Sequence, residues 1–373
     1  MSLRDRLQRA AAGALTSDEL YSRFGITENP FPSASQSSNN PHQRSSLDEA
    51  IDEKVESFIR DQRSEIVVLV GTQGVGKTNI LNYYERELGR ALPDLDGFYV
   101  IRYLSDPEAS FDGVLRRLFQ EFGQEHLRQL GRAIHANEDA ETMLLTARGH
   151  EMRVALRRLA KTDGNEDVAE AMLEWLLGLR VLNRHKDLLQ VHFRLDTVEA
   201  KTAALRDLVY VSKEAGLLNG IFLLLDELEK QDGVLSPTYV ARYLSAMRAL
   251  IDALPNHLFM MLAVTPDAMR RYSLALPAFR SRMQDQLELK PLSNLDDALR
   301  LANFYLRRAR RQAVRDRGRD PPPTAEPVLS DEELEAIFHE RFKVARASRD
   351  EGLRQRDLLH ALHQAAESVI QGR

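Results

Sequence analysis

Three short apolar runs constrain the fold of this chain more than any other sequence feature. They span residues 66–70, 221–225 and 259–264, and each is bounded by polar or turn-forming residues. Such runs are too short for free-standing helices and lack the alternation of a strand with one wet face, but they match the fully buried strands of a parallel sheet. A fourth segment, 97–104, is aromatic and β-branched. Because helical patterns separate the four, the sequence predicts an α/β fold with a parallel sheet and flanking helices.

A glycine-rich segment directly follows the first of these strands. Its sequence, GTQGVGKT, matches GxxxxGK followed by Ser or Thr, and a helical pattern comes next. In such a loop, backbone N–H groups point at phosphate oxygens and the helix N-terminus adds its positive end. We expect Lys77 to reach the β- and γ-phosphates and the Thr78 hydroxyl to ligate Mg²⁺. The predicted nucleotide-binding residues are Gly71, Thr72, Gln73, Gly74, Val75, Gly76, Lys77 and Thr78.

Two carboxylates follow the strand at 221–225. Ligands bind at the carboxyl ends of parallel strands, so Asp226 is the expected partner of Thr78 at the metal. Glu227 is placed to orient and polarise an attacking water. An apolar strand that ends in two acids is a weak signal alone, but together with the glycine-rich loop it favours nucleotide hydrolysis.

Two further features follow the third strand. Thr265 ends this strand and offers a hydroxyl to the γ-phosphate or the water, although Thr265-Pro-Asp is equally typical of a helix cap or turn. Arg280 and Arg282 precede a short predicted strand at 287–289. Either is a candidate arginine finger for a neighbouring subunit, and the alternative is a solvated surface pair.

The C-terminal part of the chain is predicted to be helical. Capping boxes at Ser293 and Ser330 indicate two helix starts. Arg354 and Arg356 precede a last apolar helix, from which one of them could reach the nucleotide. The most basic stretch either contacts DNA phosphates or forms a solvated helix face; its members are Arg307, Arg308, Arg310, Arg311, Arg315, Arg317 and Arg319.

Composition excludes several function classes. The 373 residues have a formal net charge of −5, so nucleic-acid contact requires a local basic patch. The absence of cysteine excludes disulfides, thiolate catalysis and Cys-type metal sites. No apolar run approaches the ~20 residues of a membrane span, so we expect no membrane partner and a cytoplasmic protein.

Three parts are expected along the chain. The predicted parts are an arm and linker at 1–45, a nucleotide-binding domain at 46–290 with a helical insertion at about 105–216, and a helical lid at 291–373. Apolar residues at helical spacing are predicted to form the core of the insertion. Two of these stripes are Leu115, Leu118, Phe119 and Phe122, and Met172, Trp175, Leu176 and Leu179.

The order of these features resembles the AAA+ ATPases, above all the initiator-type branch with Orc/Cdc6 proteins and the ATPases that regulate DNA transposition. A second resemblance, to the BREX-system ATP-binding family of bacterial phage defence, comes from Trp175-Leu-Leu-Gly178, Ala215-Gly216 and Asp226-Glu-Leu-Glu229. The 149 positions between Lys77 and Asp226 agree with a long helical insertion.

These resemblances imply an ATP hydrolase that uses ATP and Mg²⁺, forms homo-oligomers and acts on DNA or on other defence-system or mobile-element proteins. They imply that Thr265 is the sensor-1 residue, that Arg282, or else Arg280, is the finger, and that Arg356, or else Arg354, is the lid arginine. The alternative function is an ATP-gated scaffold or a transposition-regulator ATPase that recruits a partner with little turnover.

Overall fold

The computed structural model describes residues 21–33, 45–104, 110–228, 236–317 and 326–371. These residues form two compact units. The sheet unit comprises 45–71 and 83–288, and the lid unit comprises 21–33, 72–82 and 289–371. The predicted linker at 34–40, Glu229 of the BREX-like motif and Arg319 lie outside the described residues.

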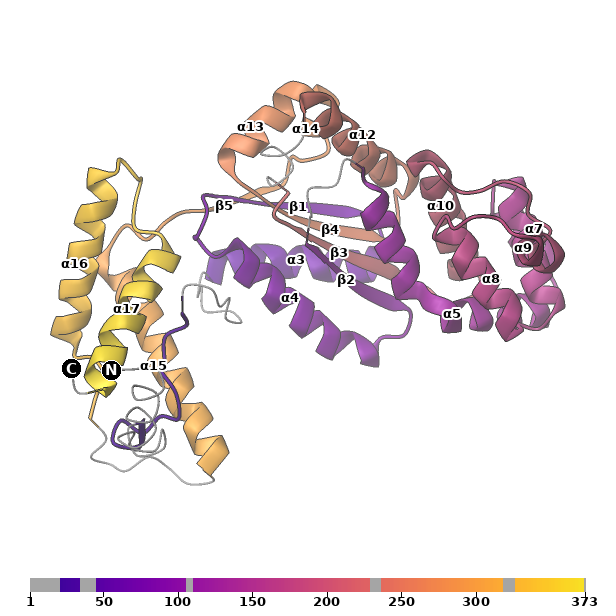
Figure 1. Cartoon of the computed structure of the whole chain (residues 1–373). Coiled ribbons are helices and arrows are strands. Elements are labelled where there is room, and N and C mark those ends of the chain that lie inside the picture. The colour runs from indigo at the N-terminus through magenta and orange to yellow at the C-terminus, as the bar shows by residue number, and fades with distance from the viewer. Residues whose placement is uncertain (1–20, 34–44, 105–109, 229–235, 318–325, 372–373) are drawn as a thin grey trace, which may run out of the picture. The chain divides into compact units, whose positions relative to one another are not determined.

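Five strands form the sheet at the centre of the sheet unit, in the order β2-β3-β4-β1-β5 (Figure 1). They are β1 (Glu65–Gly71), β2 (Phe98–Leu104), β3 (Gly220–Asp226), β4 (Leu258–Val264) and β5 (Gln286–Leu289). The first four pair in parallel, with Leu223 opposite both Ile101 and Met260. β3 and β4 are buried along their whole length. The predicted parallel α/β fold is therefore confirmed.

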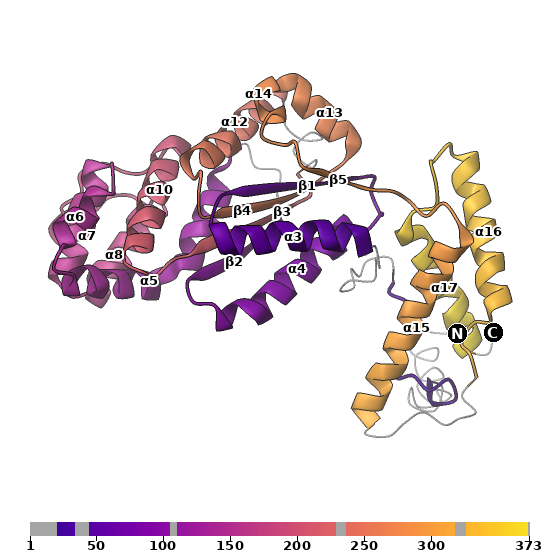
Figure 2. The same ribbon diagram turned by 180° about the vertical axis from the view of Figure 1, so that it is seen from behind.

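Helices cover both faces of this sheet (Figures 1 and 2). On one face, Phe58 of α3 (Ser45–Asp61) packs edge-on against Phe222 with ring centroids 5.1 Å apart. Leu223, the next residue of β3, points to the opposite face and shares a core with α5 (Asp112–Ala136), α10 (Val198–Glu214) and α12 (Pro237–Ala253). Burial on both faces explains why these strands are apolar at consecutive positions.

The segment between β2 and β3 is the predicted helical insertion. Its buried stripe on α5 contains the predicted Leu115, Leu118, Phe119 and Phe122. Trp175 is 1% exposed, and its indole N–H donates to the Phe193 carbonyl at 2.9 Å. The prediction that Leu179 continues the Trp175 stripe is wrong. The helix ends at Leu176, the chain turns at Gly178 with φ +76°, and Leu179 is 46% exposed.

The remaining helices connect these elements. They are α4 (Lys77–Ala91), the 3₁₀ helix η1 (Leu92–Asp94), α6 (Ala140–Leu145), α7 (His150–Lys161), α8 (Glu166–Leu176), α9 (Asn183–Leu189), α13 (Pro266–Ala275) and α14 (Pro277–Arg280).

The lid unit combines three helices with the described part of the N-terminal arm. The helices are α15 (Leu295–Arg317), α16 (Asp331–Ala347) and α17 (Gln355–Ile370). Phe24 and Phe31 of the arm are buried in the same core as these helices. The Asn29 amide fixes the arm to α17, because it donates to the His363 carbonyl at 3.1 Å.

The structure distinguishes between the two predicted caps. Ser330 and Glu333 form a reciprocal capping box at the start of α16, as predicted. The box predicted at Ser293 is wrong by one residue, because Asn294 accepts from the Asp297 N–H at 2.8 Å. Ser and Asn are both favoured N-cap residues, so the sequence alone does not show which of the adjacent Ser293 and Asn294 caps the helix.

A buried histidine joins the insertion to the sheet. The two ring nitrogens of His126 lie 2.8 Å from the Tyr99 and Ser212 hydroxyls, and burial lowers the pKa of His126 to about 4. The unfolded chain, with a His pKa of about 6.5, therefore binds more protons than the folded chain between these two values. Stability conferred by the neutral ring is lost as the pH falls through this window.

We expect His126→Gln to remove part of this pH dependence, since Gln does not titrate. For the wild type, the histidine contributes a loss of about 2 kcal/mol between pH 7.5 and pH 5.0, because its pKa is about 4 in the folded chain and about 6.5 in the unfolded chain. Urea unfolding at pH 7.5 and 5.0 measures it, with the exposed His339→Gln as the control. An equal loss in His126→Gln and in wild type would contradict the assignment. Burial also lowers the pKa of His257. Because the wild type and both variants contain this histidine, it does not affect the comparison between them.

Candidate functional site

The glycine-rich loop has the backbone geometry that phosphate binding requires. Gly71 ends β1 and α4 begins at Lys77. Gly74 and Gly76 have φ values of +81° and +105°, which L side chains rarely adopt. The Lys77 ammonium folds back over the loop and donates to the Thr72 carbonyl at 3.2 Å, which leaves Lys77 only 7% exposed.

The N-terminus of α17 lies against this loop within the lid unit. The Arg356 N–H donates to the Gly74 carbonyl at 3.0 Å. A Cβ atom on Gly76 would lie 2.7 Å from Oε1 of Gln355, a residue that is 4% exposed. The two candidate lid arginines therefore both adjoin the loop. They differ in their partners, since Arg354 forms a 3.0 Å ion pair with Asp350 whereas the Arg356 side chain is exposed.

Asp226 is the last residue of β3 and is 1% exposed. Its Oδ2 accepts from Nη2 of Arg102 at 2.7 Å, and its Oδ1 accepts from the Glu227 N–H at 2.9 Å. Glu227 has φ +54°, in the left-handed region that costs a non-glycine residue ~1 kcal/mol or more. This backbone conformation changes the direction of the Glu227 side chain at the end of β3, where the sequence predicts the water-activating group.

Sequence reasoning missed Arg102. The residue lies on β2 opposite Leu224, 124 positions before its partner. Its signal was an arginine inside an otherwise apolar and aromatic strand. An arginine is almost never buried without a counter-charge, so this position required a carboxylate nearby.

The parallel pairing brings three predicted positions to one edge of the sheet. Val70 pairs with Val264 and Leu225 with Leu262. Gly71 and Asp226 therefore end their strands at the same edge at which Thr265 follows the end of β4. Thr265 also caps α13, because its Oγ1 accepts from the Ala268 N–H at 3.3 Å. This bond uses an oxygen lone pair and not the hydroxyl hydrogen.

The two candidate finger arginines have different surroundings. Arg282 donates a hydrogen bond from Nε to Oδ1 of Asp252 at 2.9 Å, and its Nη2 forms an ion pair with the same oxygen at 2.8 Å. Arg248 shares the same carboxylate at 3.3 Å. Arg280, at the end of α14, is exposed and forms no ion pair within the described ranges.

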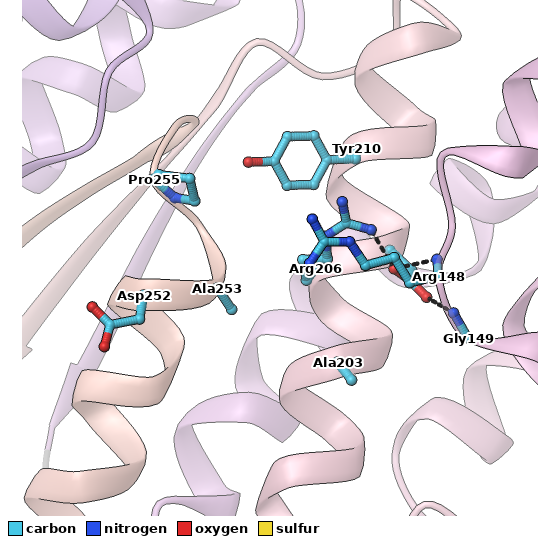
Figure 3. Close-up of a pocket in the computed structure, with 9 residues that line it drawn as sticks. Arg148, Gly149, Ala203, Arg206, Tyr210, Asp252, Ala253 and Pro255 are labelled. Atoms are coloured by element: carbon cyan, nitrogen blue, oxygen red, sulfur yellow. Dashed lines mark hydrogen bonds and ion pairs between the residues drawn. The ribbon is translucent and has the colours of Figure 1, made fainter.

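Asp252 also borders a cavity of about 290 Å³ between α10 and the C-terminal end of α12 (Figure 3). Arg206 projects into it from α10, stacks 4.6 Å from the centre of the Tyr210 ring and donates to Asp207 at 2.7 Å. The Asp207 carboxylate also accepts hydrogen bonds from the backbone N–H groups of Arg148 and Gly149. None of the predicted nucleotide-site residues lines this cavity.

The predicted basic stretch lies in the C-terminal half of α15 in the lid unit. Arg307, Arg308, Arg311 and Arg315 are exposed, and Arg310 is half-buried. No acidic residue interrupts the chain from 307 to 315.

The residues present suit ATP and Mg²⁺. The left-handed glycines, the folded-back lysine and the helix that begins at Lys77 match the requirements of a phosphate chain. Mg²⁺ prefers oxygen ligands and binds through one or two protein groups together with waters and phosphates. Thr78 and Asp226 offer such oxygens. A larger cage is not needed, and the described residues contain no cluster of three or more His or acidic side chains able to hold a metal.

The strand, glycine loop and helix on a parallel sheet define a P-loop nucleotide-binding protein. The family model of the BREX system ATP-binding protein BrxC/D matches residues 112–361, and the chain belongs to this family. The predicted resemblance to the BREX family is thus confirmed. A search of curated proteins finds no match to this chain.

Three solved structures illustrate the similarity to known folds. The ORC2 protein of Aeropyrum pernix, in ADPNP–ADP complexes, is 11% identical with a TM-score of 0.44, over 90% of this chain and 72% of that one. Drosophila ORC bound to DNA is 13% identical with a TM-score of 0.39, over 97% and 73%. A Walker-type ATPase of Pyrococcus abyssi is 12% identical with a TM-score of 0.41, over 89% and 69%. No described helix is both long and apolar enough to cross a membrane.

Proposed function

We propose that this protein is a Mg²⁺-dependent ATPase that self-assembles and acts on DNA or DNA-bound partners in a BREX-type phage-defence system, in the cytoplasm. The proposal rests on the P-loop at the edge of the sheet where β3 delivers Asp226 and Glu227. Membership of an ATP-binding family of the BREX system supports it. Other defence-system proteins are the expected partners.

Each residue of the site has a distinct role in this proposal. The loop N–H groups and Lys77 bind the phosphates and neutralise their charge. Mg²⁺, held through Thr78 and Asp226, supplies electrostatic stabilisation of the phosphoryl oxygens when it is bound. Glu227 orients the attacking water and accepts its proton, while the Thr265 hydroxyl donates to a phosphate oxygen.

A second candidate function is an ATP-gated scaffold, including the transposition-regulator type, that recruits a partner with little turnover. The ion pair that holds Asp226 to Arg102 at 2.7 Å favours it, since Asp226 must leave this partner before it can hold Mg²⁺. Single-turnover hydrolysis, with and without duplex DNA, separates the two functions.

We expect Lys77→Ala to abolish ATP binding and Glu227→Gln to keep binding while it slows hydrolysis strongly, by ~10²-fold or more for the loss of a general base. Equilibrium binding of a fluorescent ATP analogue and single-turnover phosphate release measure the two steps. Wild-type hydrolysis in Glu227→Gln would exclude Glu227 as the water-activating residue.

Self-assembly is proposed because an arginine finger stabilises the transition-state charge on the nucleotide of a neighbouring subunit. Arg282 and Arg280 are the candidates for this role, and Arg282 must first leave the Asp252 carboxylate. Arg280 forms no such ion pair within the described ranges.

We expect the hydrolysis rate per subunit to rise with protein concentration. Arg282→Ala should bind ATP nearly normally and reduce hydrolysis by ~10³-fold, as for arginine fingers elsewhere. Mixing Arg282→Ala with Lys77→Ala should restore part of the activity, because one interface then contains an intact loop and an intact finger. Demonstrated co-assembly without recovery would transfer the role to Arg280, which the same mixing experiment tests.

DNA binding is proposed for the arginines of α15. If they bind phosphates, replacing Arg307, Arg311 and Arg315 with Gln should weaken binding to all duplex sequences alike and reduce the salt slope by ~0.9 for each phosphate that is no longer neutralised. Fluorescence anisotropy at several salt concentrations measures both quantities. Arg341→Gln on α16, in the same unit, is the matched control. Unchanged affinity and slope would identify the stretch as a solvated helix face.

A further inference from the structure

The ion pair between Arg102 and Asp226 joins the second strand of the sheet to the predicted metal ligand. Asp226 has a 2% exposed side chain and Arg102 a 15% exposed one, so solvent screens the pair weakly. Both carboxylate oxygens of Asp226 already accept hydrogen bonds, one from Arg102 and one from the Glu227 N–H. A divalent cation that uses Asp226 therefore competes with a guanidinium for the same oxygen.

A second carboxylate lies within reach of the same arginine. Glu85 of α4 has Oε2 3.8 Å from Nε of Arg102, and its side chain is 44% exposed. Arg102 thus lies between a buried acid and a half-exposed acid. When Asp226 turns to a cation, Glu85 keeps the guanidinium paired, which avoids the cost of a buried unpaired charge.

We propose that Arg102 is a positioning residue that holds Asp226 in the metal-free protein, competes with Mg²⁺ for it, and transfers to Glu85 when the metal binds. This inference rests on the proposed Mg²⁺–ATP function of the site. In this arrangement, Arg102 determines the Mg²⁺ concentration that the protein requires to bind the nucleotide tightly.

The buried ion pair between Arg206 and Asp207 in the sheet unit lacks this arrangement. Asp207 pairs with Arg206 but uses its two oxygens to hold the backbone N–H groups of Arg148 and Gly149, which makes it a structural support. Asp226 instead ends a strand at the edge where the P-loop begins. Its one backbone bond is to the adjacent Glu227 N–H.

The test measures the Mg²⁺ midpoint for binding of a fluorescent ATP analogue to the full chain, with binding in EDTA as the baseline. Arg102→Gln removes the competing charge and should lower the midpoint roughly tenfold, from the Coulomb repulsion between a guanidinium and Mg²⁺ a few ångströms apart. Glu85→Gln removes the alternative partner and should raise the midpoint about two- to threefold. A general charge effect would also give opposite shifts, so the double variant decides between the two. If Glu85 acts only as the alternative partner of Arg102, adding Glu85→Gln to Arg102→Gln should leave the midpoint unchanged, whereas a general charge effect would raise it.

Two further variants complete the design. Arg102→Lys keeps the charge and should have a near-wild-type midpoint. If circular dichroism shows that Arg102→Gln does not fold, Arg102→Lys and Glu85→Gln still provide the test. Arg90→Gln, an exposed arginine of α4 that pairs with Glu87, is the matched charge control. Its midpoint should not change.

The outcomes separate the two proposals. If wild type binds the analogue but Arg102→Gln leaves the midpoint unchanged or raises it, Arg102 does not compete with the metal and the inference is overturned. An unchanged or lowered midpoint in Glu85→Gln overturns the transfer step. If wild type does not bind the analogue even at saturating Mg²⁺, the proposed ATP function itself fails.

Discussion

Burial of the central strands on both faces is the constraint on which the rest of the molecule depends. β3 and β4 have no solvent-facing side, so these two strands can present polar groups only at their ends. Parallel pairing then brings the ends of β1, β3 and β4 to one edge. Gly71, Asp226 and Thr265 occupy these positions for this reason, although at least 38 residues lie between any two of them in the sequence.

The same burial explains the helical insertion. The chain between β2 and β3 supplies helices that cover one face of the sheet. Two of these helices, α5 and α10, share a continuous core with Leu223 and Met260. The Trp-Leu-Leu-Gly segment ends α8 within this insertion. A Cβ atom on Gly178 would lie 2.8 Å from Nζ of Lys201 and 2.5 Å from the Leu195 carbonyl. The glycine thus allows the buried Lys201 to reach Asp112, with which it pairs. Gly178 of the family motif therefore has a packing role.

Local sequence patterns were sufficient to predict the elements and the first layer of the site. Apolar runs predicted four strands, and the fixed spacing of GTQGVGKT predicted the loop, because both signals lie within a few consecutive residues. Contacts between distant segments were not predictable in this way. The Arg102 guanidinium meets Asp226 across 124 positions, and Gln355 meets Gly76 across 279, so neither leaves a periodic signal. Errors at Leu179 and Ser293 have a different cause, since they concern the residue at which a helix ends or begins.

The loop and α17 set a physical limit on how the lid unit can respond to a nucleotide. Gly74 and Gly76 have no side chains, so the first turn of α17 approaches the loop backbone directly, and the Arg356 N–H bonds to the Gly74 carbonyl. The Gly74 carbonyl of the loop therefore faces the helix. Any change in the loop backbone is therefore transmitted first to residues 354–356, through a hydrogen bond and van der Waals contact. The arm follows α17 because Asn29 and Phe31 are bonded to His363. A rearrangement of the loop would thus move the helix and the arm together.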